Sequence, residues 1–245
     1  MRKSLLSSLV LVIALILAVT PMALAANFNA SLDYMFGNAD YSDSDDNGFD
    51  ATLNGFQIKG NFDITDKIAV MGSYYSASSV DAVPLAGIGK GDLENNKLDI
   101  AGLYNLGQGL KIGAGWVKFG FEVAGEGYSA NRDYSGLELV GSYKMNFGSG
   151  LGVDAAVGFA PSLSVTDKVK GDVGDPGRTA EASYKGSLLG FEIGATYAIS
   201  ENINIKGGYR STRISGDGKP DHPEYRFLSH DYTVSGFFLG VGADF

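Results

Sequence analysis

The segment KPDHPEYRFLSHD, residues 219–231, contains both histidines of the chain and the residue types of a hydrolytic site. An imidazole can act as a general base, and a serine hydroxyl can act as a nucleophile, when the fold brings them together. A solvated loop commonly contains the same residues, however, and no G-x-S-x-G motif of the lipase type occurs in the loops. We therefore expect neither a catalytic site nor enzymatic activity from the candidates, which are Asp221, His222, Ser229, His230 and Asp231.

A second polar segment, DSDDNG at residues 43–48, matches the opening D-x-[DN]-x-[DN]-G of a calcium-binding loop. The candidate ligands are Asp43, Asp45 and Asn47. The position that should supply a bidentate glutamate is Asn54, and no helical pattern flanks the segment. The segment is therefore interpreted as a solvated acidic loop and only a weak calcium candidate. We expect no bound metal and no cofactor.

The charge balance and the absence of cysteine limit the partners and the means of stabilisation. The formal net charge is −9 at pH 7, and such an acidic chain argues against nucleic acid, which needs a basic surface. The chain has no cysteine, so it gains no stability from disulfides.

Residues 1–25, MRKSLLSSLVLVIALILAVTPMALA, carry the features of a secretory signal peptide. Arg2 and Lys3 give a positive start, residues 9–19 are an unbroken apolar run, and an Ala-Leu-Ala cleavage site follows. The apolar run is too short for a membrane-anchoring helix, which needs roughly 20 residues. We therefore expect residues 26–245 to form the mature, exported domain.

Apolar residues recur at every second position in ten segments of this domain. Each run predicts a β-strand with one apolar face. The last run is typical, because Phe237, Leu239, Val241, Ala243 and Phe245 share one face. The ten segments are 28–36, 56–64, 68–74, 98–106, 110–116, 137–145, 151–159, 189–199, 203–209 and 237–245.

The alternation alone fits both a soluble sandwich with its apolar faces inward and a membrane barrel with its apolar faces toward lipid. Aromatic residues at the ends of the apolar faces, such as Phe237 and Phe245, favour the barrel. So do the connections, which alternate between short and long, and the even strand number, which places both termini on the periplasmic side. We expect a transmembrane, antiparallel, up-and-down β-barrel of ten strands, with eight or twelve as alternatives. The short connections, each predicted to be a three-residue turn, are 65–67, 107–109, 148–150 and 200–202; the long ones are roughly 37–50, 79–95, 122–134, 162–183 and 215–231.

The last strand, with Phe237, Leu239, Val241 and Phe245 on one face, resembles the C-terminal signal by which bacterial outer-membrane barrels are recognised for insertion. The mature chain resembles the outer membrane protein beta-barrel family that includes small barrels of the OmpA, OmpW and Opa type. The resemblance implies a location in the bacterial outer membrane, contact with its lipid and with the barrel assembly machinery, and no particular function. Ten strands also match the omptin surface proteases. The omptin pattern of an Asp separated from a His by one residue is absent, however, because Asp221 and His222 are adjacent.

The register of the predicted hairpins places charged residues opposite one another in the lumen. When the apolar faces are kept outward, Glu192 lies opposite Arg210, and Lys144 lies opposite Asp154, which predicts two ion pairs. The inward faces carry six acids and six bases, a balance that argues against a strongly charge-selective pore. These residues are Asp33, Asp99, Glu138, Asp154, Glu192, Asp244, Lys59, Lys97, Lys111, Lys144, Lys206 and Arg210.

Two functions remain open from the sequence. Small inward residues, many of them glycine, leave space for a narrow or gated porin-like channel for a small solute. The balanced lumen charges and the long loops instead favour a sealed barrel with a structural role or a surface binding role for an unknown ligand. Phe119, Phe121 and Phe238 are predicted to point inward near the loop side, where they either form an apolar vestibule or plug the mouth.

Overall fold

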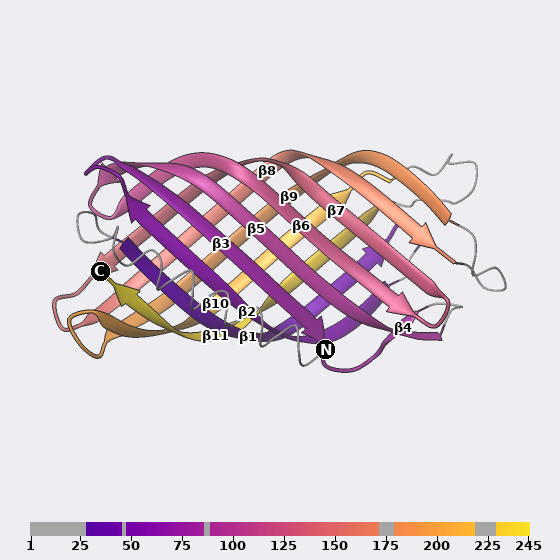
Figure 1. The fold of residues 1–245 in the computed structure, drawn as a ribbon, viewed down its shortest axis with the longest axis horizontal. Coiled ribbons are helices and arrows are strands. Elements are labelled where there is room, and N and C mark those ends of the chain that lie inside the picture. The colour runs from indigo at the N-terminus through magenta and orange to yellow at the C-terminus, as the bar shows by residue number, and fades with distance from the viewer. Residues whose placement is uncertain (1–27, 46–47, 86–88, 172–178, 219–228) are drawn as a thin grey trace.

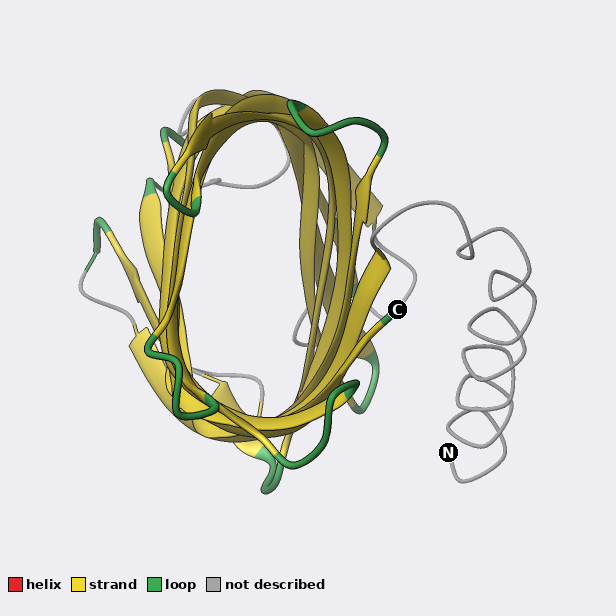
Figure 2. Ribbon diagram, turned by 90° about the vertical axis from the view of Figure 1, so that its left-hand side faces the viewer, coloured by secondary structure: helices red, strands yellow, loops and turns green. Residues whose placement is uncertain are grey.

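The computed structural model describes residues 28–45, 48–85, 89–171, 179–218 and 229–245, so residues 1–25 lie outside the described part. Its eleven strands form one antiparallel sheet that closes into a barrel where β3 pairs with β5 (Figures 1 and 2). Ten strands are long and β4 is a three-residue addition beside β5, so the expectation of a ten-stranded up-and-down barrel is confirmed. The strands are β1 (Phe28–Asp43), β2 (Gly48–Asp63), β3 (Ile68–Ser79), β4 (Val83–Leu85), β5 (Gly89–Gly107), β6 (Leu110–Gly125), β7 (Tyr128–Asn146), β8 (Leu151–Lys170), β9 (Thr179–Ala198), β10 (Ile203–Gly216) and β11 (His230–Asp244).

No helix in the described part of the chain is long and apolar enough to span a membrane.

The first and last strands of the chain also pair with each other, and we call this pairing of β1 with β11 the closing seam. β1 pairs with β11 from Asn29 opposite Asp244 to Asp43 opposite His230. At the end of this seam the backbones of Phe28 and Phe245 exchange two hydrogen bonds of 3.2 and 2.8 Å, and their rings stack with centroids 6.0 Å apart. These two residues lie at the same end of the barrel as the four short turns, which we call the turn end (left in Figure 1).

The outer surface near the turn end is a continuous apolar belt. Leu32, Ile100, Ile193 and Leu239 are between 42% and 63% exposed although they are aliphatic. Aromatic rings mark the far border of the belt, where Phe36 stacks on Phe237 at 6.3 Å. Exposed apolar side chains bordered by aromatic rings are the surface that a bilayer requires.

Beyond this belt polar and apolar side chains still alternate along the strands, but the outward side chains are now polar and the inward ones apolar. On β6, outward Trp116 is followed by outward Lys118 and Glu122, whereas Phe119 and Phe121 point inward and are 1% and 3% exposed. We call this part of the barrel the collar; it comprises residues 37–43, 48–55, 75–79, 83–85, 89–96, 117–125, 128–136, 160–170, 179–188, 211–216 and 230–236.

The expectation of long loops is therefore wrong at most of the five predicted positions. The strands run through the collar, and β8 and β9 reach 20 residues each. The strands were predicted too short because they were identified by an outward apolar face. That face ends at the border of the lipid belt, and the outward residues above it face water and are polar. On β8 the sense of the alternation also changes at Pro161, where a register shift between Ala160 and Leu163 turns Leu163 inward.

Three of the four short connections are three-residue turns, as predicted. Ile64 N donates to Ile68 O, Phe147 N to Leu151 O, and Ile199 N to Ile203 O, each at 2.8 Å. The prediction is wrong at the fourth connection, where Gly107 pairs with Leu110 after a register shift. Gln108 and Gly109 there have φ of +53° and +82°, which suits a two-residue turn of the mirror-image type.

Candidate functional site in the barrel lumen

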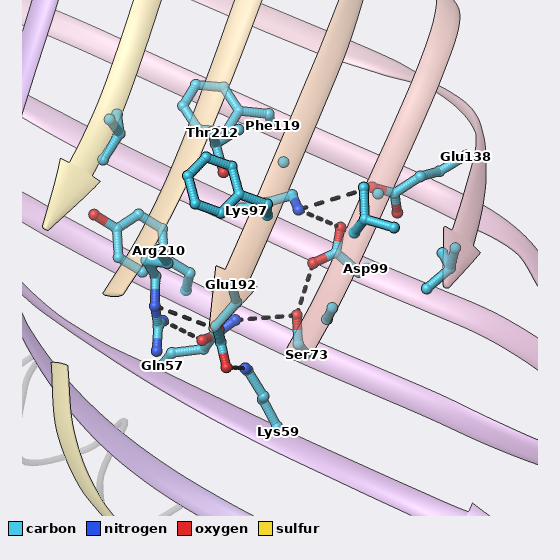
Figure 3. A pocket seen from close by; sticks show the side chains of 18 of the residues that line it. Gln57, Lys59, Ser73, Lys97, Asp99, Phe119, Glu138, Glu192, Arg210 and Thr212 are labelled. Atoms are coloured by element: carbon cyan, nitrogen blue, oxygen red, sulfur yellow. Dashed lines mark hydrogen bonds and ion pairs between the residues drawn. The ribbon is translucent and has the colours of Figure 1, made fainter. Parts of the chain in front are cut away.

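The lumen of the lipid-facing part holds a chain of ion pairs and hydrogen bonds centred on Arg210 (Figure 3). Arg210 extends inward from β10, where it is 8% exposed. Its Nη2 lies 3.1 Å from Asp33 Oδ2 on β1, and its Nη1 donates to Gln57 Oε1 on β2. Lys206 Nζ also lies 2.9 Å from Asp33 Oδ2. A single guanidinium therefore ties together strands on both sides of the closing seam.

The predicted pair of Glu192 and Arg210 is present. The two residues face each other on β9 and β10, and Arg210 Nε lies 3.5 Å from Glu192 Oε2. Glu192 also accepts a hydrogen bond from Lys59 on β2, across the lumen (Figure 3). Glu192 therefore has two cationic partners, one on the adjacent strand and one reached only because the sheet closes.

The second predicted ion pair is wrong. Lys144 and Asp154 do face each other on β7 and β8, as the register predicted. The ammonium of Lys144 instead lies 3.9 Å from Asp244 Oδ1 on β11, and both side chains are about half exposed. Lys144, Asp154 and Asp244 line the same cavity at the turn end, and the long lysine side chain reaches across it to Asp244 rather than to the neighbouring strand.

A further branch of this network of hydrogen bonds and ion pairs continues along the inner wall of the barrel. Gln57 Nε2 donates to Ser73 Oγ at 3.4 Å, and Ser73 Oγ donates to Asp99 Oδ2 at 2.7 Å. Lys97 lies 3.1 Å from Asp99 and 3.9 Å from Glu138 on β7 (Figure 3). Ser73 and Gln57 carry no charge and were not predicted, but their inward parity on β3 and β2 is the signal that would have found them.

The ring of Phe238 lies against three cationic side chains of the lumen. Phe238 is 1% exposed, and its ring centroid lies 4.4 Å from Arg210 Cζ, 5.6 Å from Lys206 Nζ and 6.0 Å from Lys59 Nζ. A cation over a ring face is attracted by the ring quadrupole. Phe238 thus connects the apolar side chains of the collar to the charged side chains of the lumen. We call the latter the charged layer; it comprises Asp33, Lys59, Asp63, Lys97, Asp99, Lys111, Glu138, Glu192, Lys206 and Arg210.

Two of the inward glycines, Gly158 and Gly208, do not leave empty space beside them. A Cβ at Gly158 would lie 2.1 Å from Glu138 Oε1, and a Cβ at Gly208 would lie 2.7 Å from the Phe238 ring. Long side chains from other strands therefore occupy the space over these glycines.

Two cavities remain between the side chains of the lumen. The one near the turn end has a volume of about 220 Å³ and includes Lys111 and Asp244 in its lining. The other, about 120 Å³, lies deeper and includes Ser73 and Phe119. Both are lined by Lys59, Met71, Ala156 and Glu192. The Lys59–Glu192 ion pair therefore stands at the boundary between the two cavities.

The collar interior is filled by apolar side chains from every part of the wall. Phe121 and Tyr232 stack with centroids 4.4 Å apart, and the Tyr232 hydroxyl donates to Asn95 Oδ1 at 2.5 Å. Phe119, Phe121 and Phe238 all lie in this cluster, as their predicted inward direction requires. We call the following set the plug: Met35, Leu53, Leu93, Val117, Phe119, Phe121, Tyr134, Leu163, Val165, Leu188, Ile214, Tyr232, Val234 and Phe238, each at most 4% exposed.

A buried polar cluster lies beside the plug in the collar. Arg132 Nε lies 2.5 Å from Asp167 Oδ2, and its Nη1 donates to Tyr41 OH at 2.9 Å. Burial opposes the charge on Arg132, yet the Asp167 carboxylate beside it holds the pKa of Arg132 well above its usual range. Burial raises the pKa of Tyr134, whose hydroxyl contacts His230 Nε2. Apolar alternation did not reveal this cluster, because its residues fall within the predicted loops 37–50, 122–134, 162–183 and 215–231.

The other predicted site residues are placed as follows. Phe237, Leu239 and Val241 lie on the lipid-facing side of β11, Phe245 directly follows this strand, and all four are 45% to 63% exposed. Ser229 lies just before β11, and His230 and Asp231 are its first two residues. The remaining positions, Asn47, Asp221 and His222, are outside the described residues.

The calcium candidates Asp43 and Asp45 lie at the end of β1 and just beyond it, where Asp45 N donates to Asp43 Oδ1 at 2.9 Å. Among the residues that the structure describes, no group of three or more His, Asp or Glu side chains is arranged to hold a metal ion.

Comparison with known proteins agrees with this architecture. The outer membrane protease OmpT from Escherichia coli has a TM-score of 0.52 and 13% identity, covering 89% of this chain and 97% of OmpT, which shows a shared fold alone. Neisserial surface protein A matches at 15% identity with a TM-score of 0.44, covering 89% of this chain and 97% of that protein. Ail of Yersinia pestis matches at 14% identity with a TM-score of 0.39, covering 90% and 99%. No curated protein matches the sequence. Residues 9–245 match the family described as "Outer membrane protein beta-barrel domain", and the chain therefore belongs to this family of outer-membrane proteins.

Proposed function

We propose that this protein is a sealed outer-membrane barrel whose collar serves a structural or binding role at the cell surface. The observation that carries the proposal is the plug. Its side chains belong to the strands rather than to a loop, and they meet across the full width of the lumen. A path for solutes through the collar would require repacking of a close-packed core, in which even one lost methylene is costly.

The charged layer beneath the plug supports the same function. Most of its acids and bases take part in ion pairs between different strands, such as Lys59 with Glu192 and Lys111 with Asp63. Buried pairs of this kind hold opposite walls together, and breaking one leaves an uncompensated charge. The charged layer thus stabilises the barrel inside the membrane. The collar above it presents a polar outer surface.

We further propose that the turn end faces the periplasm and the collar faces the outside. A barrel of this family has its short turns on the periplasmic side, and the described chain ends, Phe28 and Phe245, are at the turn end. The lipid-facing C-terminal strand is then available to the assembly machinery as a recognition signal, and the collar is available to partners at the surface. We propose no enzymatic activity.

A narrow or gated channel is the second candidate, because the two lumen cavities lie in series below the plug. Liposome swelling distinguishes the candidates. Vesicles that contain the refolded mature protein should swell in a small sugar no faster than protein-free vesicles. Swelling at a rate that scales with the amount of protein would favour the channel instead.

A further inference from the structure

The deeper lumen cavity has the size of a small-molecule site. Its volume is about 120 Å³; ten of its twenty lining residues are apolar or glycine, including Met35, Met71 and Val234, and the other ten are polar or charged. Binding pockets for small molecules combine apolar surface with polar groups that fix the orientation of the bound molecule. An apolar protein cavity of roughly 150 Å³ holds one benzene molecule, so the size fits a single small ring.

Three polar atoms in this lining make no hydrogen bond within the described residues, namely Tyr75 OH, Asp99 Oδ1 and Arg210 Nε. Asp99 Oδ1 lies 3.1 Å from Lys97 Nζ, and Arg210 Nε lies 3.5 Å from Glu192 Oε2. Among the described residues, the Tyr75 hydroxyl is therefore the one of the three that has no ion-pair partner either.

Tyr75 is 5% exposed, and its hydroxyl makes no hydrogen bond within the part of the chain that the structure describes. A buried hydroxyl normally has a hydrogen-bond partner. Neighbouring Ser73 and Gln57, by contrast, are bonded to each other and to Asp99 or Arg210. Tyr75 is therefore the group that can donate to a bound molecule without breaking an existing bond.

The charges in the lining favour an uncharged molecule. Three cations and three anions line the cavity, and they are engaged with one another. A charged solute would enter this balanced set without a free counter-charge and would lose its hydration. The six groups are Lys59, Lys97, Arg210, Asp99, Glu138 and Glu192.

We propose that this cavity binds a small neutral solute with one apolar side and one hydrogen-bonding group, about the size of phenol, and that Tyr75 is its polar contact. The solute reaches the cavity from the turn end, because Lys59, Met71 and Glu192 line both this cavity and the larger one that precedes it. The plug closes the other side through Phe119, which belongs to both the plug and the cavity lining. This site is independent of whether the barrel conducts.

Methionine methyl groups provide a direct readout of binding. Met35 and Met71 line the cavity, whereas Met145 lies on the lipid-facing surface and is 38% exposed. Phenol titrated into the micelle-bound protein with ¹³C-methyl methionine should shift the Met35 and Met71 signals saturably. Met145 should show only the linear drift of phenol dissolved in detergent. Equal, non-saturating shifts at all three methyl groups would overturn the proposal.

Two variants and a second probe test the assignment to Tyr75 and to the cavity. Tyr75→Phe should weaken phenol binding about fivefold, in keeping with the loss of one hydrogen bond, and should leave toluene binding unchanged. Gly190 lines the cavity, and a Cβ added at this position would have ordinary contact distances, the nearest atom being Thr212 Oγ1 at 3.5 Å. Gly190→Val should therefore fold and abolish binding of both probes. Undiminished phenol binding in both variants, or a crystal structure grown with phenol that shows ordered water alone in the cavity, would contradict the site.

Discussion

Phe121 on β6 and Tyr232 on β11 stack with centroids 4.4 Å apart, although their strands lie five steps apart in either direction around the barrel. This contact joins opposite walls of the lumen within the plug. In the sealed barrel that we propose, it is one of the contacts that close the lumen.

The stacked pair should be energetically coupled. Phe121→Ala should destabilise the folded barrel by about 3 kcal/mol, the lower end for a core aromatic residue. The double-mutant cycle with Tyr232→Ala should give a coupling of about 1 kcal/mol, typical of an aromatic pair. Reversible urea unfolding in micelles measures both quantities. Additive effects of the two substitutions would show that the rings do not support each other.

Arg210 should matter much more for stability than Lys144. Arg210→Met leaves Asp33 and Glu192 each with one cation fewer in a buried layer, so we expect a loss of about 3 kcal/mol. Lys144→Met removes an ion pair between side chains that are 51% and 47% exposed, so the loss should be at most about 1 kcal/mol. The same unfolding experiment compares them. Equal losses of stability would mean that the charged layer stabilises the barrel no more than an exposed ion pair does.

Gly158, over which the Glu138 side chain lies in the lumen, and Gly102, which faces lipid, should tolerate bulk differently. A Cβ at Gly158 would lie 2.1 Å from Glu138, whereas nothing lies within 4 Å of a Cβ at Gly102 on the lipid-facing surface. Gly158→Leu should therefore reduce the yield of the folded, heat-modifiable form on gels, and Gly102→Leu should leave it unchanged. A normal yield of folded Gly158→Leu would indicate spare space in the lumen.

The collar contains a carboxylate whose effect on stability depends on pH. A hydrogen bond from the Ser215 hydroxyl, aided by Arg213, lowers the pKa of Asp231. The stabilisation is present above the pKa of the unfolded carboxyl, near 3.9, and is lost as pH falls through the lowered pKa of the folded state. Because the Asp231 side chain is 44% exposed, solvent screening should keep the effect below about 1 kcal/mol.

Ser215→Ala tests this linkage. The variant should be slightly less stable than wild type at neutral pH, and the difference should shrink as pH falls below the unfolded pKa and vanish once the folded carboxyl is also protonated. Unfolding curves followed by the fluorescence of Trp116 across this range provide the measurement. A difference that grows on acidification would contradict the predicted direction of the pH dependence.

The sequence was sufficient for the strands near the membrane and for contacts between neighbouring strands. Apolar alternation alone predicted that Glu192 faces Arg210, because register follows once one face is assigned. It could not predict that Lys59 also reaches Glu192, or that Lys144 reaches Asp244, since those contacts depend on how the closed sheet brings distant strands together. The pair of Arg132 and Asp167 was missed for another reason: above the lipid belt the inward face becomes apolar, and a rule based on outward apolar residues no longer finds the strand.

Single-channel recording tests the central claim most directly. The refolded wild-type protein in a planar bilayer should show no openings, because the plug spans the collar. The Phe121→Ala/Tyr232→Ala variant, shown to be folded by its heat-dependent gel shift, should show small, steady openings. Steady openings of the wild-type protein would contradict the sealed barrel and establish a channel.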